Sequence, residues 1–382
     1  MEASPDVHIP PHGLAASEAP AHGEADGALR CSAPSALIEA VIEGIHISWW
    51  GMLGTLSRIY LDVLFFDYLN ITSPSGALFL DWPANVMGSW LVGLVIGLST
   101  EIADEVPLIA NFVEYGPQLQ VGLQTGFCGC ITTYASWNHQ MVSILVLSGS
   151  QFCVGLAGFV LGLHSIMASY SIGVHNARLV ALYVGGTRLA EKHREIGSSR
   201  SWSQNASRPS PHHDLPEIAS LSQSRRTWTI IVSFLLVLSL AASITGWAVE
   251  KEEGKGYWAA VTLSPIGALA RWQLGKLYNK RIRFSGNNAP FFPLGTFIAN
   301  MIASLFRSLI AAIITDSPTE LNPAVLAACS GINTGLLGSL STASTFAAEI
   351  SKLVDFTPTD LRNLGKTGYY GYLYASVSIV IR

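Results

Sequence analysis

Two asparagines are the residues best placed to do chemistry, because each lies in the middle of a long apolar segment. Asn85 lies in the sequence WPANVMG, and Asn300 lies in GTFIANMIA. An amide in apolar surroundings costs free energy unless it is hydrogen-bonded. Such an amide commonly holds membrane helices together. Two amides at matched positions could instead offer their N–H donors to an anion.

Two further segments combine glycine with an unusual number of hydroxyl side chains. Residues 126–137 read GFCGCITTYASW, and residues 335–346 read GLLGSLSTASTF. Glycine lowers helix stability, and Ser and Thr can satisfy the backbone groups that a broken helix releases. A close-packed glycine seam is the alternative. The many hydroxyls favour a break, whose free carbonyl groups could hold a cation.

Charged side chains in the apolar segments are few. Arg58 ends the sequence GMLGTLSR and Arg271 ends SPIGALAR, so each follows a glycine by four residues. Both are expected to be structural or to line an ion-attracting vestibule. Arg307 has no counterpart in the first half and is expected to be structural. Glu349 is the one plausible acid for ion coupling.

These three motif pairs occur in the same order in both halves of the chain. The chain is therefore expected to contain two equivalent units joined by one extra helix. An odd number of crossings between the units turns the second one upside down in the bilayer. Inverted repeats of this kind are a transport architecture, with the site near the membrane midplane at the repeat interface.

Composition supports a membrane protein. Charged residues make up 13% of the 382 residues, and the stretch 59–177 holds no Lys or Arg. Soluble chains carry about 25% charged residues. The net charge of −4 gives no support to nucleic-acid binding. The five cysteines lack the spacing of a disulfide framework or metal site, and no catalytic triad or phosphate loop is present, so an enzyme is not expected.

Nine segments are long and apolar enough to cross a bilayer, which takes about 20 residues. They are 45–65, 78–99, 119–147, 150–172, 227–248, 257–278, 292–314, 322–350 and 367–382. Basic residues concentrate in the polar stretch 178–226, which the positive-inside rule places in the cytoplasm. Counting outward from it gives a cytoplasmic N-terminus and an outer C-terminus.

The predicted fold class is an all-α multi-pass membrane protein with two four-helix units in inverted orientation and about nine transmembrane helices. Its expected parts are a disordered cytoplasmic tail (1–43), a first unit (44–172), a cytoplasmic linker (173–226), a connecting transmembrane helix (227–248) and a second unit whose last helix is short or truncated (256–382).

Together the motifs resemble the CrcB/Fluc fluoride channels, and the fused layout is similar to that of the eukaryotic fluoride exporters (FEX). The family pattern is a Gly-x-x-x-Arg helix, an Asn helix, and then Gly-x-x-Gly-x-x-Thr-Thr-Phe-Ser-Thr-Phe. The resemblance covers roughly residues 45–172 and 257–382. It implies a passive channel, in the plasma membrane, through which cytoplasmic fluoride leaves the cell. Because the two units are fused, a monomer is expected.

The resemblance also implies which residues form the site. The pore residues would be Asn85, Asn300, Tyr134, Phe346, Thr133, Ser344 and Thr345. A structural sodium ion would bind backbone carbonyl groups near Gly129, Thr132, Thr133, Gly338, Ser341 and Thr342. Fluoride is small and strongly hydrated, so a pore must replace its water with donors such as amide N–H groups and the positive edges of aromatic rings.

The chain departs from the family's pair of phenylalanines. The first half has Tyr134 and Trp137 at these positions, and the second half has Ala343 and Phe346. If the first ring of one unit faces the second ring of the other, Tyr134 pairs with Phe346 in one pore. The other pore keeps Ala343 and Trp137. We therefore expect one working and one degenerate pore. A secondary transporter for another small solute and a membrane protein without transport activity are the alternatives.

Overall fold

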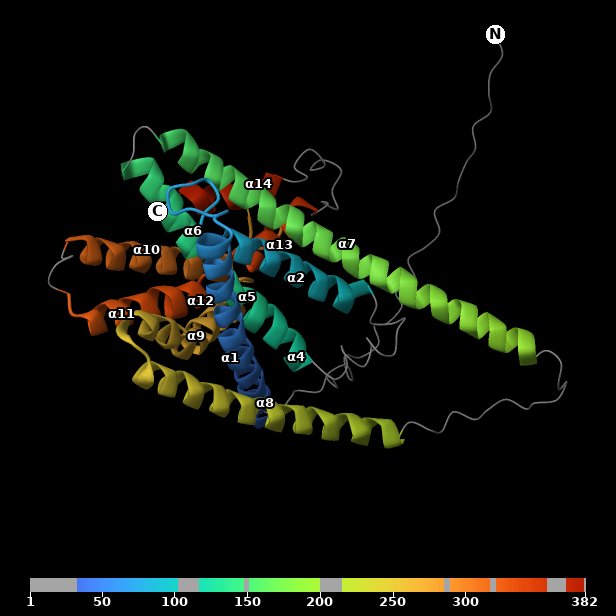
Figure 1. Ribbon diagram of the computed structural model, residues 1–382. Helices are drawn as coiled ribbons and strands as arrows, with labels where there is room; N and C mark the ends of the chain where they lie inside the picture. Colours follow the sequence, from blue (N-terminus) through green and yellow to red (C-terminus); the bar gives the residue numbers. More distant parts are fainter. Residues whose placement is uncertain are drawn as a thin grey trace, which may run out of the picture. The chain divides into compact units, whose positions relative to one another are not determined.

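The computed structural model describes residues 33–101, 117–147, 151–199, 215–284, 289–316, 321–355 and 369–380 (Figure 1). Within these ranges the chain is helical, and the one β-bridge pairs Arg283 with Phe291. The described residues from Ala40 onward form one compact unit. This confirms the all-α class.

The first half of the chain forms helices interrupted by two π-helical turns. They are α1 (Ala33–Val63), η1 (Leu64–Tyr68), α2 (Trp82–Glu101), α4 (Pro117–Val121), η2 (Gly122–Cys128), α5 (Gly129–Ile131), α6 (Tyr134–Leu147) and α7 (Phe152–Ser199).

The connecting helix and the second half follow in the same order. They are α8 (Leu215–Val249), α9 (Glu252–Tyr278), α10 (Leu294–Asp316), α11 (Pro323–Gly331), η4 (Ile332–Leu337), α12 (Gly338–Leu340), α13 (Ala343–Val354) and α14 (Tyr369–Val380). The series α9 to α14 repeats the series α1 to α7, because both contain a long helix, a second helix, a helix interrupted by a π turn, and a last helix.

Six helical stretches in the described ranges are long and apolar enough to cross a membrane. They are Ala36–Tyr68, Trp82–Ser99, Phe152–Tyr183, Arg225–Val249, Leu294–Asp316 and Pro323–Val354. The described residues of the predicted spans 119–147, 257–278 and 367–382 are mostly helical but are not among these six. The first of them is interrupted, the second lies in α9, which carries charged residues at its start and toward its end, and α14 has only 12 residues.

Helix boundaries differ from the sequence-based ones at three places. Helix α1 begins at Ala33, so residues 33–43 are helical and do not belong to a disordered tail. Helix α7 continues through residue 172, the expected end of the first unit, as far as Ser199 (Figure 1). Helix α8 begins at Leu215 rather than at residue 227. Polar residues extend these helices beyond their apolar parts, and an apolarity criterion does not detect such extensions. Residues 1–32 and 200–214 lie outside the described ranges.

The glycine of each Gly-x-x-x-Arg motif sits where two helices of the same unit approach closely. A Cβ atom at Gly54 in α1 would collide with the carbonyl oxygen of Phe127 in η2. A Cβ atom at Gly267 in α9 would collide with the carbonyl oxygen of Leu336 in η4. Each long helix therefore packs directly on the backbone of its own unit's π turn. This places the arginine one turn further along on the same side of the helix.

Candidate functional site

Both predicted helix breaks are present, and they have the same construction. Helix α5 ends where Thr132 adopts an extended backbone (φ −96°, ψ 149°), and α6 starts two residues later. Helix α12 ends where Ser341 adopts an extended backbone (φ −88°, ψ 157°), and α13 follows. A π turn precedes each break, at η2 and η4. The backbone groups at each break consequently need partners outside the helix.

Each asparagine supplies such partners to the break of its own unit. Asn85 accepts a hydrogen bond from the Thr133 backbone N–H at 2.8 Å and donates to the Thr133 carbonyl oxygen at 3.0 Å. Asn300 does the same with Thr342, at 2.8 and 3.3 Å. All four residues are buried. Each amide therefore clamps a broken helix and keeps a second N–H outside this clamp.

Hydroxyl side chains join the two breaks to each other. The Thr132 hydroxyl lies 3.0 Å from that of Ser344 and 3.3 Å from that of Thr342. The Thr133 and Ser341 hydroxyls lie 3.1 Å apart. The Thr345 backbone N–H bonds to the Thr342 hydroxyl at 3.3 Å. The hydroxyl count of the motif is thus explained by contacts between the two units.

The matched arginines each reach the interrupted helix of the other unit, and Arg271 also bonds to Ser341 of its own unit. Arg271 in α9 donates to the carbonyl oxygens of Gly129 at 2.6 Å and Ser341 at 3.2 Å, and its other terminal nitrogen donates to Thr125 at 2.5 Å. Arg58 in α1 donates to the carbonyl oxygen of Thr334. Arg58 is 1% exposed and Arg271 5% exposed, so neither side chain snorkels to the membrane surface.

The rings expected to share a pore are in contact. The Tyr134 and Phe346 rings lie edge to face with centroids 5.4 Å apart. Phe346 also meets Tyr374 of α14 at 5.3 Å, and the Tyr134 hydroxyl donates to the Ser378 carbonyl oxygen at 2.6 Å. Ring edges carry partial positive charge. These residues therefore form a line of ring edges between the units.

Trp137 lies one turn further along α6 and also touches the Tyr134 ring, with the two ring centroids 5.7 Å apart. Its indole stacks on Phe79 at 5.7 Å and packs against Phe159 at 5.8 Å. The indole N–H donates to the Gly158 carbonyl oxygen at 3.2 Å, and Trp137 is 0% exposed. Ala343 is buried in the same hydrophobic cluster and adds no ring. The Trp137 indole is therefore packed among large apolar groups, and its one donor is already used.

Glu349 is held by three polar groups near the Tyr134–Phe346 pair. Its carboxylate accepts from the hydroxyls of Thr296 at 2.6 Å and Tyr374 at 2.9 Å, and from the Asn279 amide at 3.3 Å. Thr296, Glu349, Tyr374 and Phe346 thus form a continuous series of contacts. Gln140 holds the equivalent place in the first unit, and it bonds to Leu80 and Ser73 instead.

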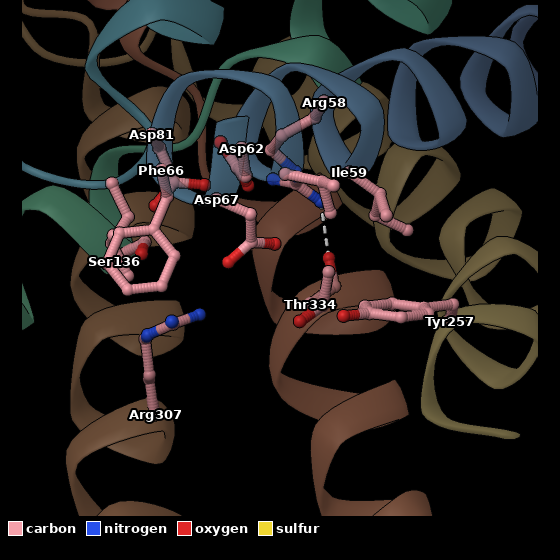
Figure 2. A pocket seen from close by; sticks show the side chains of 12 residues that line it. Arg58, Ile59, Asp62, Phe66, Asp67, Asp81, Ser136, Tyr257, Arg307 and Thr334 are labelled. Atoms are coloured by element: carbon pink, nitrogen blue, oxygen red, sulfur yellow. Dashed lines mark hydrogen bonds between the residues drawn. The ribbon is translucent and has the colours of Figure 1, made fainter. Parts of the chain in front are cut away.

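Two equivalent pockets open at opposite ends of α9. The first pocket has a volume of about 300 Å³ and lies near the start of α9, where Tyr257 lines it. Its other lining residues include Arg58, Ser136, Asp62, Asp67, Asp81 and Arg307. In Figure 2 Arg307 reaches into it from α10 and Arg58 bonds to Thr334. Carboxylates therefore outnumber cations in this pocket.

The second pocket, of about 410 Å³, lies at the α9 end. Arg271 and Thr345 occupy the places that Arg58 and Ser136 have in the first. Lys276 and Lys280 also line it, and the described lining residues include no carboxylate. Lys276 does pair with Glu43 beside the pocket, at 2.8 Å. The two pockets therefore have the same frame and opposite charge balance.

Sequence reasoning missed several of these residues. Asp62 and Asp81 were not singled out, and Arg307 was read as structural. Tyr374 was overlooked, although Tyr370, Tyr374 and Ser378 are spaced four residues apart, which places them on one helix face.

The fold and the site define an all-α membrane protein in which two copies of one helical unit meet at their broken helices. A model of the family described as "CrcB-like protein, Camphor Resistance (CrcB)" matches residues 45–174 and 258–381. This is more than half of the chain, with one match on each side of the connecting helix. The chain belongs to this family.

Individual relatives are similar over one unit or more. A fluoride-specific ion channel FluC of Geotalea daltonii is 32% identical over 26% of this chain and 70% of its own length. One of Leptospira interrogans is 29% identical over 29% of this chain and 81% of its own length. Fluoride export protein 1 of Candida albicans is 24% identical over 41% of this chain and 38% of its own length. No solved structure matches the chain significantly.

Proposed function

We infer that the chain is a passive, fluoride-selective channel that lets cytoplasmic fluoride leave the cell and so protects against fluoride toxicity. The observation that carries this function is the duplicated helix break. Each break is clamped by a buried Asn, and it occurs in both halves of a CrcB-family chain. Relatives that are similar to single units are named fluoride-specific ion channels, and a relative from Candida albicans is named a fluoride exporter.

One of the two possible routes conducts. It starts at the basic pocket, where Thr345 and Thr296 line the wall. It continues past the Glu349 and Tyr374 side chains to the Tyr134–Phe346 pair. Amide, hydroxyl and ring-edge donors along this route replace the water that fluoride loses.

The equivalent route from the acidic pocket does not conduct. It would pass Ser136 and reach Trp137, whose indole is packed between Phe79 and Phe159 and bonded to Gly158. Nothing along this indole can turn toward an anion without breaking that packing. This assignment keeps Asn85 and Thr133 as part of the central frame, and Ala343 and Trp137 as the degenerate pore.

The charge balance of the two pockets fits export. With the N-terminus in the cytoplasm, the end of α9 that carries Lys276 and Lys280 faces the cytoplasm. A cleft of one sign of charge raises the local concentration of the opposite ion. Fluoride is therefore gathered on the inner side. The aspartates of the other pocket weaken its hold on the released anion.

The chain acts as an integral membrane protein, in the plasma membrane, as a monomer that contains both units. No catalytic role is proposed. The test is growth on fluoride of a host that lacks its own exporter, together with fluoride efflux from liposomes that contain the purified chain. Rescue and efflux selective for fluoride over chloride, and unchanged by a proton gradient, support a channel. Saturable efflux driven by protons would identify a secondary transporter instead.

A further inference from the structure

The centre of the molecule already contains a protein cation. The resemblance to fluoride channels implies a sodium ion held by backbone carbonyl groups of the two breaks. Two of those carbonyl groups, one from each break, accept hydrogen bonds from a single nitrogen of Arg271. The Gly129 oxygen lies at 2.6 Å and the Ser341 oxygen at 3.2 Å. The guanidinium thus bridges the breaks of both units, which is the role expected of the ion.

The surroundings of Arg271 are built around this position. Gly129 leaves room for the guanidinium, because a Cβ atom there would meet the Arg271 terminal nitrogens. The Arg271 side chain is buried, and it donates to the carbonyl oxygens of Gly129, Ser341 and Thr125 and to the Cys130 sulfur at 3.8 Å. Carbonyl dipoles therefore balance its charge, as they would balance a sodium ion.

Arg58, the repeat counterpart of Arg271, makes it unfavourable to add a metal cation at this centre. The Arg58 guanidinium lies against Gly338, where a Cβ atom would meet it, and it bonds to the Thr334 carbonyl oxygen. Two fixed positive charges thus face the breaks from opposite sides. A third cation between them would be repelled, and burial strengthens that repulsion. The residues of this centre do not fit a sodium ion bound to the Gly129 and Ser341 carbonyl groups.

We propose that the Arg271 guanidinium replaces the central sodium ion in this chain, so that neither its stability nor its activity depends on sodium. The proposal concerns the core of the proposed channel and rests on that function only for the efflux measurement. Arg271 is then a positioning residue, since it holds the two breaks together, although it also lines the basic pocket where the proposed route starts.

The deciding experiment measures the thermal midpoint of the purified full-length protein in detergent. Sodium chloride is exchanged for choline chloride at constant ionic strength. A ligand that binds the folded state raises the midpoint as its concentration rises. We expect the wild-type midpoint to stay constant across the exchange. A saturable rise of the wild-type midpoint with sodium overturns the proposal.

Two variants test whether Arg271 is the cause of the sodium-independent midpoint. Arg271→Gln removes the bridging cation and is expected to lower the midpoint by several degrees and to make it rise with sodium, because the carbonyl groups are free. Arg281→Gln removes an exposed arginine just beyond the end of α9 and serves as the matched control. It should leave the midpoint unchanged. If Arg271→Gln does not fold, the wild-type titration still decides.

Fluoride efflux from liposomes in sodium and in choline separates this proposal from the proposed function. Equal efflux in both salts agrees with the proposal, and efflux that requires sodium contradicts it while the channel function stands. If the wild-type protein shows no fluoride efflux and its thermal midpoint does not change with sodium, the guanidinium site is supported and the channel function is contradicted.

Discussion

The Tyr134 and Phe346 rings meet edge to face at a centroid distance of 5.4 Å, although they come from opposite halves of the chain. The contact brings together the first ring position of one unit and the second ring position of the other. Their repeat partners, Ala343 and Trp137, cannot form an equivalent pair, because one has no ring and the other is bonded to Gly158. The two sides of the molecule are therefore alike in backbone and different in side chains.

The asymmetry predicts unequal effects of substitutions at the two ring positions. Phe346→Ile removes the ring edge from the proposed conducting route and is expected to reduce fluoride efflux from liposomes by at least tenfold, about 1.4 kcal/mol of barrier. Trp137→Phe changes the packed side and should keep efflux within a factor of about two. If Phe346→Ile has no effect, the assignment of the conducting side is wrong.

The asparagine clamps predict a symmetric effect on stability. Asn85→Ala and Asn300→Ala each leave a buried backbone N–H and carbonyl group without partners, at Thr133 and Thr342. Each unsatisfied group costs about 1–3 kcal/mol. Both variants should lower the thermal midpoint by similar amounts.

Efflux should not follow that symmetry. Asn300 belongs to the unit that supplies Phe346, and it holds Thr342, three residues before Thr345 of the basic pocket. Per folded molecule, we expect a larger loss of efflux from Asn300→Ala than from Asn85→Ala. Equal losses, together with an unaffected Phe346→Ile variant, would contradict a single working pore.

The close approaches at Gly54 and Gly267 predict a paired effect on folding. Alanine at either position drives a Cβ atom into a backbone oxygen, of Phe127 or Leu336. Overpacking typically costs about 1–3 kcal/mol. Both variants should show lower midpoints and lower yields of folded protein. Gly44→Ala is the control, because its nearest non-local atom, in Leu269, would lie at an ordinary 3.5 Å.

The sequence predicts the arrangement of the helices and their breaks better than it predicts the side-chain contacts between the two units. Glycine and hydroxyl patterns locate both breaks, since these residue types weaken a helix and can satisfy its free groups. The pairing of Tyr134 with Phe346 follows from the resemblance to fluoride channels, which implies that the first ring of one unit faces the second ring of the other. The bridge from Arg271 to Gly129 and Ser341 does not, because it joins a side chain to backbone groups of both units, which no local pattern encodes.

The charge of each pocket could not be predicted from the sequence either. Asp62 lies in α1 and Asp81 in the turn before α2, and folding brings both to one pocket with Arg307. Helix ends were also misplaced where polar residues continue a helix, as in α7 beyond residue 172. These features depend on tertiary packing, whereas apolarity and motif spacing are local.

The charge difference between the pockets predicts an efflux rate that depends on salt. Lys280 lines the basic pocket, and Lys280→Gln removes one of the charges that gather fluoride there. Efflux at low fluoride should fall several-fold at low ionic strength, where the Debye length is about 30 Å at 0.01 M, and the difference from wild type should shrink as salt is added. Arg226→Gln, an exposed change in α8 away from both pockets, is the matched control and should leave the rate unchanged at every salt concentration. A Lys280→Gln effect that is independent of ionic strength would instead mean that this lysine acts by contact rather than through its field.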